Sequence, residues 1–441
     1  MRTWVLGFIL VSSSVAACGK SGHDRPAGTV APGDGGADGD VPGPAAGGAP
    51  SGEAGDGGGP LASGGGGGTS DGGGDDGGSS GHAPGDGGAG GVGAAGTGHA
   101  GDVGAGGAHD PSPSDPNIVF ITSEAYVPAT LGGPAGADDA CNELAAAAHL
   151  SGTFVAWLST STVDARSRLG RANGWYNTRG RPFADRAAEL LDADQVYYPI
   201  NYDEHGQKVY GRVATGTSAD GAFATHDCND WQASDSNTTL VTGDANAGSV
   251  LWTNVDDGEP CSAEYHLYCF QIDNDAKLNP TPSQGRTVFI SSEVLELGPE
   301  GRAAADALCA ADAAAASLDG DFVALLPTAT EAPTERLREP TRPWVRPDGM
   351  IVASNTHSAE LDELDVAVTQ HADGAYVGGV RVLGGPTLDT TSWLTCDDWT
   401  NPVDPTTPVA LVGMIGYSDA RWHAWNPDAC SEPARVVCVE Q

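Results

Sequence analysis

Two short stretches, CSAEYHLYC at 261–269 and CSEPARVVC at 430–438, decide how this chain is organised. Each consists of a cysteine, seven residues and a second cysteine. The two cysteines that precede each stretch are 87 positions apart in both copies, at Cys141 and Cys228 and at Cys309 and Cys396. Four cysteines that recur at matching spacings over about 150 residues indicate a tandem duplication of whole domains, not a solenoid of small repeats.

Other motifs return in the same register: VFITSE (119–124) as VFISSE (288–293), SGTFVAWL (151–158) as DGDFVALL (319–326), and CNDW (228–231) as CDDW (396–399). The duplication predicts one domain over 117–272 and a second over 286–441. The segment at 273–285, DNDAKLNPTPSQG, is polar and contains proline, so we expect it to be the linker between them.

The chain begins with MRTWVLGFILVSSSVAAC. Its apolar run, from Trp4 to Val11, is too short to span a bilayer and suits the core of a signal peptide. The run leads into Val-Ala-Ala-Cys, which resembles the lipobox of bacterial lipoproteins. We therefore predict a lipoprotein signal peptide at 1–18 with a lipid on Cys18, and no aspartate follows that would favour the inner membrane. The alternative is an ordinary signal peptide that contains a cysteine.

The segment at 19–116 differs in composition from the rest of the chain. It holds 38 of the 65 glycines, and no aromatic residue occurs between Phe8 and Phe120. Such a sequence cannot bury enough apolar surface to offset the entropy lost on ordering. We expect a disordered tether that holds the domains away from a membrane.

The charge balance excludes several partners. The 441 residues include 21 Lys+Arg and 59 Asp+Glu, for a net charge of −38 at pH 7. So acidic a chain repels nucleic acid and anionic membrane surfaces, and we expect no nucleic-acid partner and no membrane contact other than the lipid.

Each copy reads as a mixture of helix and strand. In the first copy we predict strands at Ile118–Ser123, Thr153–Leu158, Ser249–Thr253 and His266–Gln271. The stretch at 136–150, GADDACNELAAAAHL, places apolar residues at helical spacing with Cys141 on the core face. The predicted fold class is α+β.

The cysteines allow two readings. A signal peptide implies an oxidising compartment, where an even set of four cysteines per domain reads as two disulfides. A four-cysteine zinc site is weaker, because the chain lacks the close Cys-x2-Cys pairs that structural zinc favours. Spacing alone leaves three connectivities open in each domain.

The stretch GPAGADDACNELAAAAHLSGTFVAWLS at 133–159 resembles the start of the endostatin domain of collagen, and the resemblance continues through VYGRVATGT, HDCNDW and CSAEYHLYCF. It extends to the bacterial endostatin-like domains (the DUF1554 group) of surface lipoproteins in spirochaetes and other bacteria. The resemblance implies two C-type-lectin-like domains with nested disulfides: Cys141–Cys269 and Cys228–Cys261, then Cys309–Cys438 and Cys396–Cys430.

The chain departs from animal endostatins at their ligand sites. Only His109 lies near the start of the first domain, so the zinc-binding histidine cluster has no counterpart, and arginines suited to heparin are sparse. Asp256, Asp257 and Glu259 could form a calcium site, but a solvated acidic loop is the favoured interpretation. We expect no metal site and no cofactor.

No familiar catalytic motif is present. His226 and His266 could act in catalysis, but the second copy has Leu394 and Arg435 at the matching positions. We therefore expect no catalytic residue. Four tryptophans of the repeat are expected in the core or at the base of a loop: Trp175, Trp231, Trp344 and Trp399.

Three classes of function remain open. A surface-anchored, non-catalytic binding or adhesion module for an extracellular protein or glycan accounts for the anchor, the tether and the duplication. A hydrolase acting on envelope or extracellular polysaccharide is the alternative, and a purely structural envelope protein leaves the duplication unexplained. Because a fold does not fix a function, the ligand stays open at this point.

Overall fold

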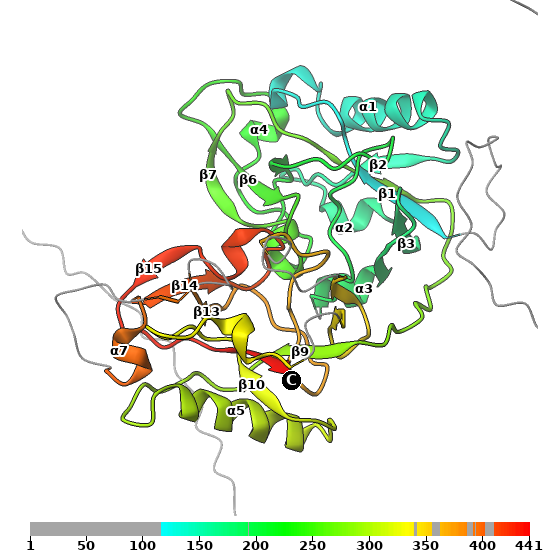
Figure 1. The fold of residues 1–441 in the computed structure, drawn as a ribbon. Coiled ribbons are helices and arrows are strands. Elements are labelled where there is room, and N and C mark those ends of the chain that lie inside the picture. The colour runs from blue at the N-terminus through cyan, green and yellow to red at the C-terminus, as the bar shows by residue number, and fades with distance from the viewer. Residues whose placement is uncertain are drawn as a thin grey trace, which may run out of the picture. The chain divides into compact units, whose positions relative to one another are not determined.

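The computed structural model describes residues 116–192, 194–338, 342–354, 362–385, 391–392, 394–401 and 410–441, all within one compact unit, Thr97–Gln441 (Figure 1). The side chains of Asp256 and Asp257 are also outside the description. The predicted signal peptide, its Cys18 and all of the glycine-rich segment except Pro116 lie outside the described residues.

The first half (117–272) is built on a five-stranded sheet with the strand order β2-β8-β1-β3-β4. In it β1 pairs antiparallel with β8 and parallel with β3. Its strands are β1 (Asn117–Ile121), β2 (Phe154–Ala156), β3 (Asn173–Asn177), β4 (Pro182–Arg186) and β8 (Tyr268–Gln271). The long helix α1 (Pro134–Ala147) lies against β2.

A smaller sheet of three antiparallel strands completes the first half: β5 (Arg212–Ala214), β6 (Thr239–Asp244) and β7 (Asp256–Pro260). Short helical turns join the strands: η1 (Pro128–Thr130), α2 (Ala165–Arg168), α3 (Ala187–Asp192), α4 (Cys228–Trp231) and η2 (Ser249–Trp252).

The second half (286–441) repeats this plan, with the strand order β10-β16-β9-β11-β12 in its larger sheet and β13-β14-β15 in its smaller one. Its strands are β9 (Arg286–Ile290), β10 (Phe322–Ala324), β11 (Trp344–Val345), β12 (Ile351–Ala353), β13 (Arg381–Leu383), β14 (Ala410–Met414), β15 (Asn426–Asp428) and β16 (Val437–Glu440). Its helices include α5 (Arg302–Ala315), η3 (Pro333–Arg336), α7 (Cys396–Trp399) and η4 (Ala420–Trp422). The predicted α+β class is confirmed.

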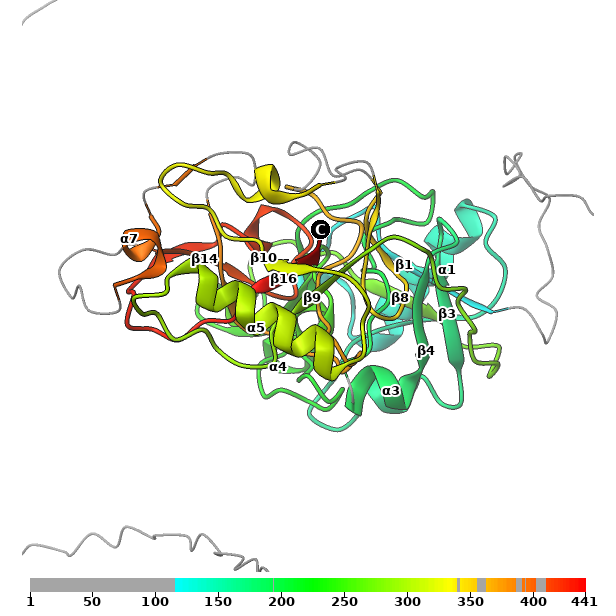
Figure 2. The same cartoon turned by 60° about the horizontal axis from the view of Figure 1, so that its bottom comes forward.

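The long helix of each half lies close to its sheet because its buried face is made of small side chains. In α1 the buried residues are Ala137, Cys141 and Ala145, and in α5 they are Ala305, Cys309 and Ala313. This spacing of four places them on one face of the helix. Figure 2 shows α5 running beside β10, β16 and β9. The predicted helix is confirmed, with bounds shifted by two or three residues.

Each large sheet separates two apolar clusters. Along β1 the side chains of Val119 and Ile121 enter one cluster and that of Phe120 enters the other, as the alternation of a strand requires. The first cluster is aromatic, with Trp157, Trp175, Phe183, Trp252 and Phe270 in mutual ring contact. The four tryptophans predicted to lie in the core are all fully buried.

Four disulfides fasten the halves internally: Cys141–Cys269, Cys228–Cys261, Cys309–Cys438 and Cys396–Cys430. These are the nested pairs that the endostatin resemblance implies. The outer bridge of each half ties the long helix to the last strand, and the inner bridge holds α4 or α7. A bridge that closes a loop this long adds about 2–4 kcal/mol of stability.

The strand predicted at Ser249–Thr253 is wrong, since Ser249–Trp252 forms the 3-10 helix η2. The backbone of Trp252 returns over β6 so closely that a Cβ on Gly243 would lie 1.8 Å from the Trp252 carbonyl oxygen. Ser249 starts this return with a φ of 52°. The other three predicted strands are confirmed with shorter bounds.

The two halves meet through equivalent loops. Register pairs Arg212 with Asp244 in the first half and Arg381 with Met414 in the second, so the loop at 245–249 corresponds to the loop at 415–419. We call these the junction loops. Between them Gly248 donates its N–H to the Gly416 carbonyl at 2.7 Å, and Ser418 donates to the Asn246 carbonyl at 2.8 Å.

These two bonds are related by a pseudo-twofold axis. Position 248 corresponds to position 418, and position 246 to position 416. The isolated antiparallel β-bridge between Ala247 and Tyr417 also joins equivalent residues. A surface that contacts its own copy in this way is isologous, the arrangement found in twofold homodimers. The duplicated chain therefore folds as an internal pseudo-dimer.

Candidate functional site

A groove of about 850 Å³ lies where the two halves and the linker meet. We call it the junction groove. Its described lining comes from Asp185, Gln195 and Tyr197 of the first half, from Lys277, Leu278, Asn279 and Pro280 of the linker, and from Ala316, Leu318, Pro347, Asp348, Met350, Gln370, Ala372, Asp373, Gly374, Ala375 and Tyr376 of the second half. A hollow of this size falls within the usual range for ligand sites.

The groove continues into a smaller hollow of about 200 Å³ that shares Ala316, Ala372 and Asp373 with it. The rest of the smaller hollow is lined by Ser292, Asp312, Ala315 and His371. The combined space is therefore elongated and suits a ligand longer than a single small ring.

One wall of the groove is supported by the buried guanidinium of Arg346, which is only 1% exposed. Arg346 crosses the junction and donates to the carbonyl oxygens of Val196 at 3.1 Å and Tyr197 at 3.3 Å, and within its own half to Thr369 at 2.8 Å. Burial works to lower the pKa of Arg346, but the charge of Asp348 and neighbouring groups outweigh it, so the pKa is raised. Arg346 remains a cation.

Asp348 links Arg346 to the other polar groups of this wall. Its carboxylate accepts from Arg346 Nη2 at 2.7 Å, from the Tyr376 hydroxyl at 2.7 Å and from the backbone N–H of Met350 at 3.0 Å. Gln370 accepts from the N–H of Asp348 at 3.0 Å and donates to the Gly374 carbonyl at 3.0 Å. Burial raises the pKa of Tyr376 well above its usual value. Because these polar groups are already bonded, this wall is fixed before any ligand arrives.

The opposite wall is less completely bonded. Asp185 lies on β4 and forms no hydrogen bond or ion pair with any described residue, and its Oδ1 is enclosed. Gln195 donates to the Tyr197 hydroxyl at 2.8 Å. The pKa of Tyr197 is raised, chiefly by burial and next by the negative charge of Asp185. The groove therefore carries unused acceptor capacity on its first-half side.

The pseudo-twofold axis relates the groove to a second region, which we call the counterpart site. Arg181 in the β3–β4 turn aligns with Met350 in the β11–β12 turn. In each turn the backbone carbonyl of this residue accepts from the N–H of the residue four positions earlier. Tyr197 aligns with Asp365, because their N–H groups bond the equivalent carbonyls of Phe183 and Val352. At the groove these positions carry Met350 and Tyr197.

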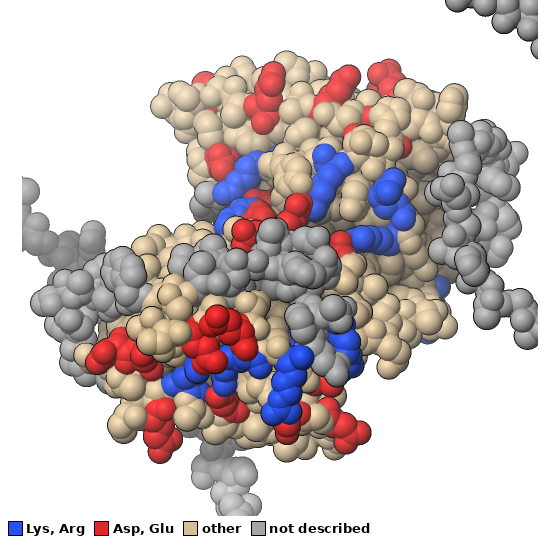
Figure 3. Space-filling model, in the orientation of Figure 1, with Lys and Arg blue, Asp and Glu red and all other residues tan. Residues whose placement is uncertain are grey.

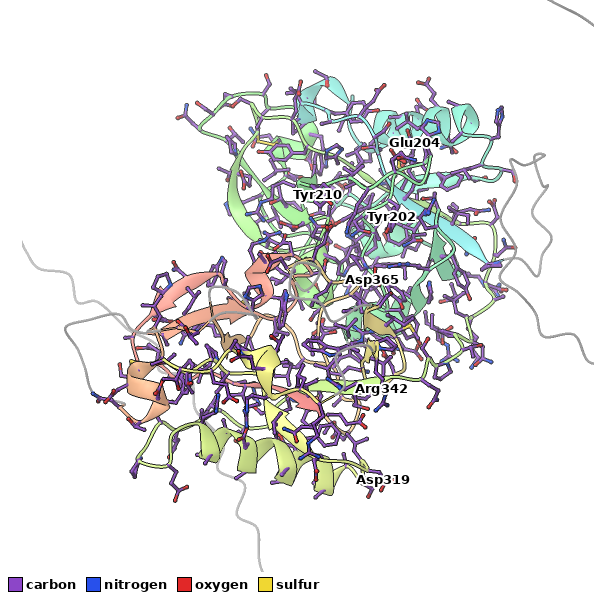
Figure 4. The ribbon with its side chains drawn as sticks, in the orientation of Figure 1. Tyr202, Glu204, Tyr210, Asp319, Arg342 and Asp365 are labelled. Carbon is purple, nitrogen blue, oxygen red and sulfur yellow. A yellow bond between two sulfur atoms is a disulfide. The ribbon has the colours of Figure 1, made fainter. Side chains whose placement is uncertain are left out.

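At the counterpart site the equivalent positions pair across the junction. Arg181 binds Asp365 at 2.8 Å, and Lys208 forms an ion pair with Glu363, which also accepts from the Tyr210 hydroxyl at 2.7 Å. Figure 4 marks Tyr210 and Asp365. Equivalent positions thus line a groove on one side of the axis and form ion pairs on the other.

Both halves also contain a left-handed turn that sequence analysis missed. In α4 the φ values of Cys228, Asn229, Asp230 and Trp231 are 58°, 54°, 52° and 63°, and the four residues of α7 have φ between 49° and 69°. Such a conformation costs roughly 1–2 kcal/mol per non-glycine residue. The motifs Cys-Asn-Asp-Trp and Cys-Asp-Asp-Trp give no clear signal for it.

Buried anchors hold each left-handed turn at both ends. The cysteine forms the inner disulfide, and the indole of Trp231 donates to the Ser159 carbonyl at 2.8 Å as that of Trp399 does to the Pro327 carbonyl at 2.7 Å. Asp230 and Asp398 accept from the backbone of the same adjacent loop. We interpret the turns as structural clamps on that loop.

The residues weighed for calcium are not brought together by any described contact. Glu259 forms an ion pair with Arg212 at 3.4 Å, and the side chains of Asp256 and Asp257 lie outside the description. Among the residues that the structure describes, no group of three His, Cys, Asp or Glu side chains is placed to hold a metal ion.

The histidines weighed for catalysis have other surroundings. His226 is exposed, whereas His266 Nδ1 lies 2.7 Å from the Thr122 carbonyl. In the second half Arg435 donates to the equivalent turn, at the Ser291 and Ser292 carbonyls. His266 and Arg435 therefore both fasten the end of the central strand.

Most arginines of the described chain are engaged in ion pairs. They include Arg166, Arg168, Arg181, Arg212, Arg302, Arg336, Arg346, Arg381 and Arg421. On the face in Figure 3, lysine and arginine side chains are interspersed with aspartate and glutamate. Few cations are left to attract a polyanion.

Within the described residues, none of the helices is both long enough and apolar enough to cross a membrane. Comparison of the chain with protein-family models and with curated proteins found no match. The disulfides remain the clearest sign of location, since they persist in oxidising, extracytoplasmic compartments.

Proposed function

We propose that this chain is a non-catalytic binding protein of the bacterial cell surface. In this proposal Cys18 carries the lipid, the glycine-rich segment is the tether, and two C-type-lectin-like halves bind an extracellular protein or glycan. The observation that carries the proposal is the junction groove, which is large, elongated and lined from both halves and the linker.

The architecture supports the lectin-like assignment. Each half combines a long helix, a larger and a smaller sheet, and nested disulfides that join the helix to the last strand. This scaffold resembles the endostatin domain in its disulfide pairing. Loops held on such a rigid frame are common sites of recognition.

The bonding of the groove supports a preformed binding surface. Asp348, Gln370 and Tyr376 are linked by hydrogen bonds to one another and to Arg346, so their side chains hold the wall in one shape. A preformed, rigid wall lowers the ordering cost of binding.

The test is a binding screen of the full chain against immobilised extracellular proteins and glycans, with the groove filled by Ala375→Trp. Ala375 is exposed and lines the groove, whereas Ala310 is exposed on α5 outside it, so Ala310→Trp is the matched control. We expect Ala375→Trp to lose the ligand and Ala310→Trp to keep it. Ligand binding unaffected by Ala375→Trp, or turnover of a polysaccharide by the chain, would contradict the proposal.

The anchor is tested separately by incorporation of radiolabelled fatty acid. We expect labelling of the chain and none after Cys18→Ala. Equal labelling of both would refute lipidation without bearing on the groove.

A further inference from the structure

The first-half wall of the groove presents a carboxylate without a partner. Asp185 forms no hydrogen bond or ion pair with any described residue, although its Oδ1 is enclosed. An enclosed charged oxygen without a bond is costly, and such groups in folded proteins generally have a reason. A cationic or N–H donor in the groove would remove that cost.

The charge of the groove favours the same kind of occupant. Asp185 and Asp373 face it, the charge of Asp348 is balanced by Arg346, and Lys277 is the only cation among its described lining residues. The raised pKa of Tyr197, which reflects burial and then Asp185 and Asp348, is consistent with a negative field there. An anionic ligand would be repelled.

Apolar side chains line the same space. Those that are partly exposed are Pro280 of the linker with Ala316, Leu318 and Pro347 of the second half. Lysine and arginine bury their methylene stems against such surfaces while keeping the charged end on a polar group. The groove therefore offers both parts of a long cationic side chain a suitable surface.

The aromatic residues of the groove argue against a sugar ring. Stacking on a sugar needs an exposed aromatic face, but Tyr197 is 9% exposed and its hydroxyl is bonded to Gln195. The ring of Tyr376 is covered by the guanidinium of Arg346, 5.4 Å from its centroid. Neither tyrosine presents a free platform.

We propose that the junction groove binds an extended peptide segment that carries a lysine or arginine side chain, with Asp185 as the partner of its cation. This proposal rests on the proposed binding function and names its ligand class. The continuation toward Asp312 and His371 gives room for the residues on one side of that cation.

The experiment uses the full chain and three capped pentapeptides: Ala-Ala-Lys-Ala-Ala and the same sequence with norleucine or glutamate at the centre. Affinities are measured by calorimetry at physiological ionic strength. We expect the lysine peptide to bind at least about tenfold more tightly than the norleucine peptide, since a bond to a charged group in a partly enclosed site is worth that much or more. The glutamate peptide should not bind.

Asp185→Asn is the decisive variant, with Asp319→Asn as the charge-matched control. Asp319 is exposed just beyond α5 and does not line the groove, although its neighbour Leu318 does, so it tests for a general effect of a nearby charge (Figure 4). Asp185→Asn should weaken the lysine peptide about tenfold while Asp319→Asn changes it less than about twofold. Lys277→Gln should strengthen it modestly by removing a like charge.

Each outcome decides something. Equal affinity for the lysine and norleucine peptides, or equal loss in Asp185→Asn and Asp319→Asn, overturns the cation-pairing proposal. Absence of peptide binding together with a glycan ligand lost in Ala375→Trp overturns it too, but leaves the proposed function intact. Because Asp185→Asn removes an unpaired charge, its melting temperature should not fall, so a folding defect would also count against the proposal.

Discussion

The junction groove and the counterpart site occupy equivalent places about one pseudo-twofold axis, yet they are chemically different. On the groove side a buried arginine, Arg346, holds the wall from behind, and Met350 and Tyr197 face open space. On the counterpart side Arg181 and Asp365 form an ion pair where those two residues would be. The same backbone arrangement thus forms a groove on one side of the axis and ion pairs across the junction on the other.

The difference teaches that the junction is fixed mainly from the groove side. A buried guanidinium that reaches carbonyl groups of both halves holds them more strongly than ion pairs that face solvent. The variants below test this ranking, from the largest expected loss of stability to the smallest.

Arg346→Met should cause the largest loss. It leaves Asp348 without its cation and the carbonyls of Val196 and Tyr197 without a donor, which corresponds to about 3–5 kcal/mol. Denaturant unfolding of the full chain measures it. Arg338→Met, which removes an ion pair exposed on both sides, is the control and should change stability little. A small loss in Arg346→Met would mean that the groove side does not hold the junction.

Arg421→Met should rank second. Arg421 binds Asp244 of the other half through both terminal nitrogens at 2.8 and 3.0 Å, packs 3.7 Å from the Tyr417 ring centroid and also binds Asp419. Because Asp244 is 4% exposed, losing the cation should cost about 1.5–3 kcal/mol. Unfolding as two separate transitions would show that the junction loops are the main link.

Lys208→Met on the counterpart side should cost at most about 0.5 kcal/mol. Its partner Glu363 is half exposed, and solvent screens such a pair. The same unfolding assay applies. A loss as large as that of Arg346→Met would invert the ranking and make the two sides equally important.

The hydrogen bond of Tyr210 to Glu363 should make the smallest contribution to stability, and its loss should be seen only at high pH. The bond to Glu363, with burial and the charge of Glu363, raises the pKa of Tyr210 to about 12. Since the folded pKa lies above the unfolded value of about 10, this contribution is present below pH 10 and lost as the pH rises toward 12. Because other tyrosines, such as Tyr126, also have a raised pKa, ultraviolet titration should show one late-titrating phenol fewer in Tyr210→Phe than in the unsubstituted chain. A normal pKa would indicate that the bond to Glu363 does not form.

The repeat made much of the fold predictable. Cysteine spacing and paired motifs such as CNDW and CDDW indicated two equivalent halves, and helical periodicity located α1 to within three residues. The strand prediction at Ser249–Thr253 was wrong, because the backbone turns back over Gly243 to bring Trp252 into the core and does not run as an extended strand. Local pattern does not encode that return.

The groove was not predictable from the sequence. Asp185, Lys277 and Asp373 lie far apart in the chain and belong to no motif, and their segments meet only where the junction loops and Arg346 join the two halves. The role of Arg346 behind the wall was equally unpredictable. Arg346 aligns with Asn177 in the first half, so comparison of the two repeats gives no sign of that role.

The pseudo-twofold junction has a consequence for how such a molecule changes over generations. In a dimer of identical chains every substitution occurs twice, so a mutation that improves one of two symmetric sites alters the other in the same way. Here the two copies of each position are separate codons in one chain, and selection can act on them independently. One side carries the Arg181–Asp365 ion pair while the other has an open space beside Asp185. The fusion of two copies thus permits a division of labour that symmetry would forbid.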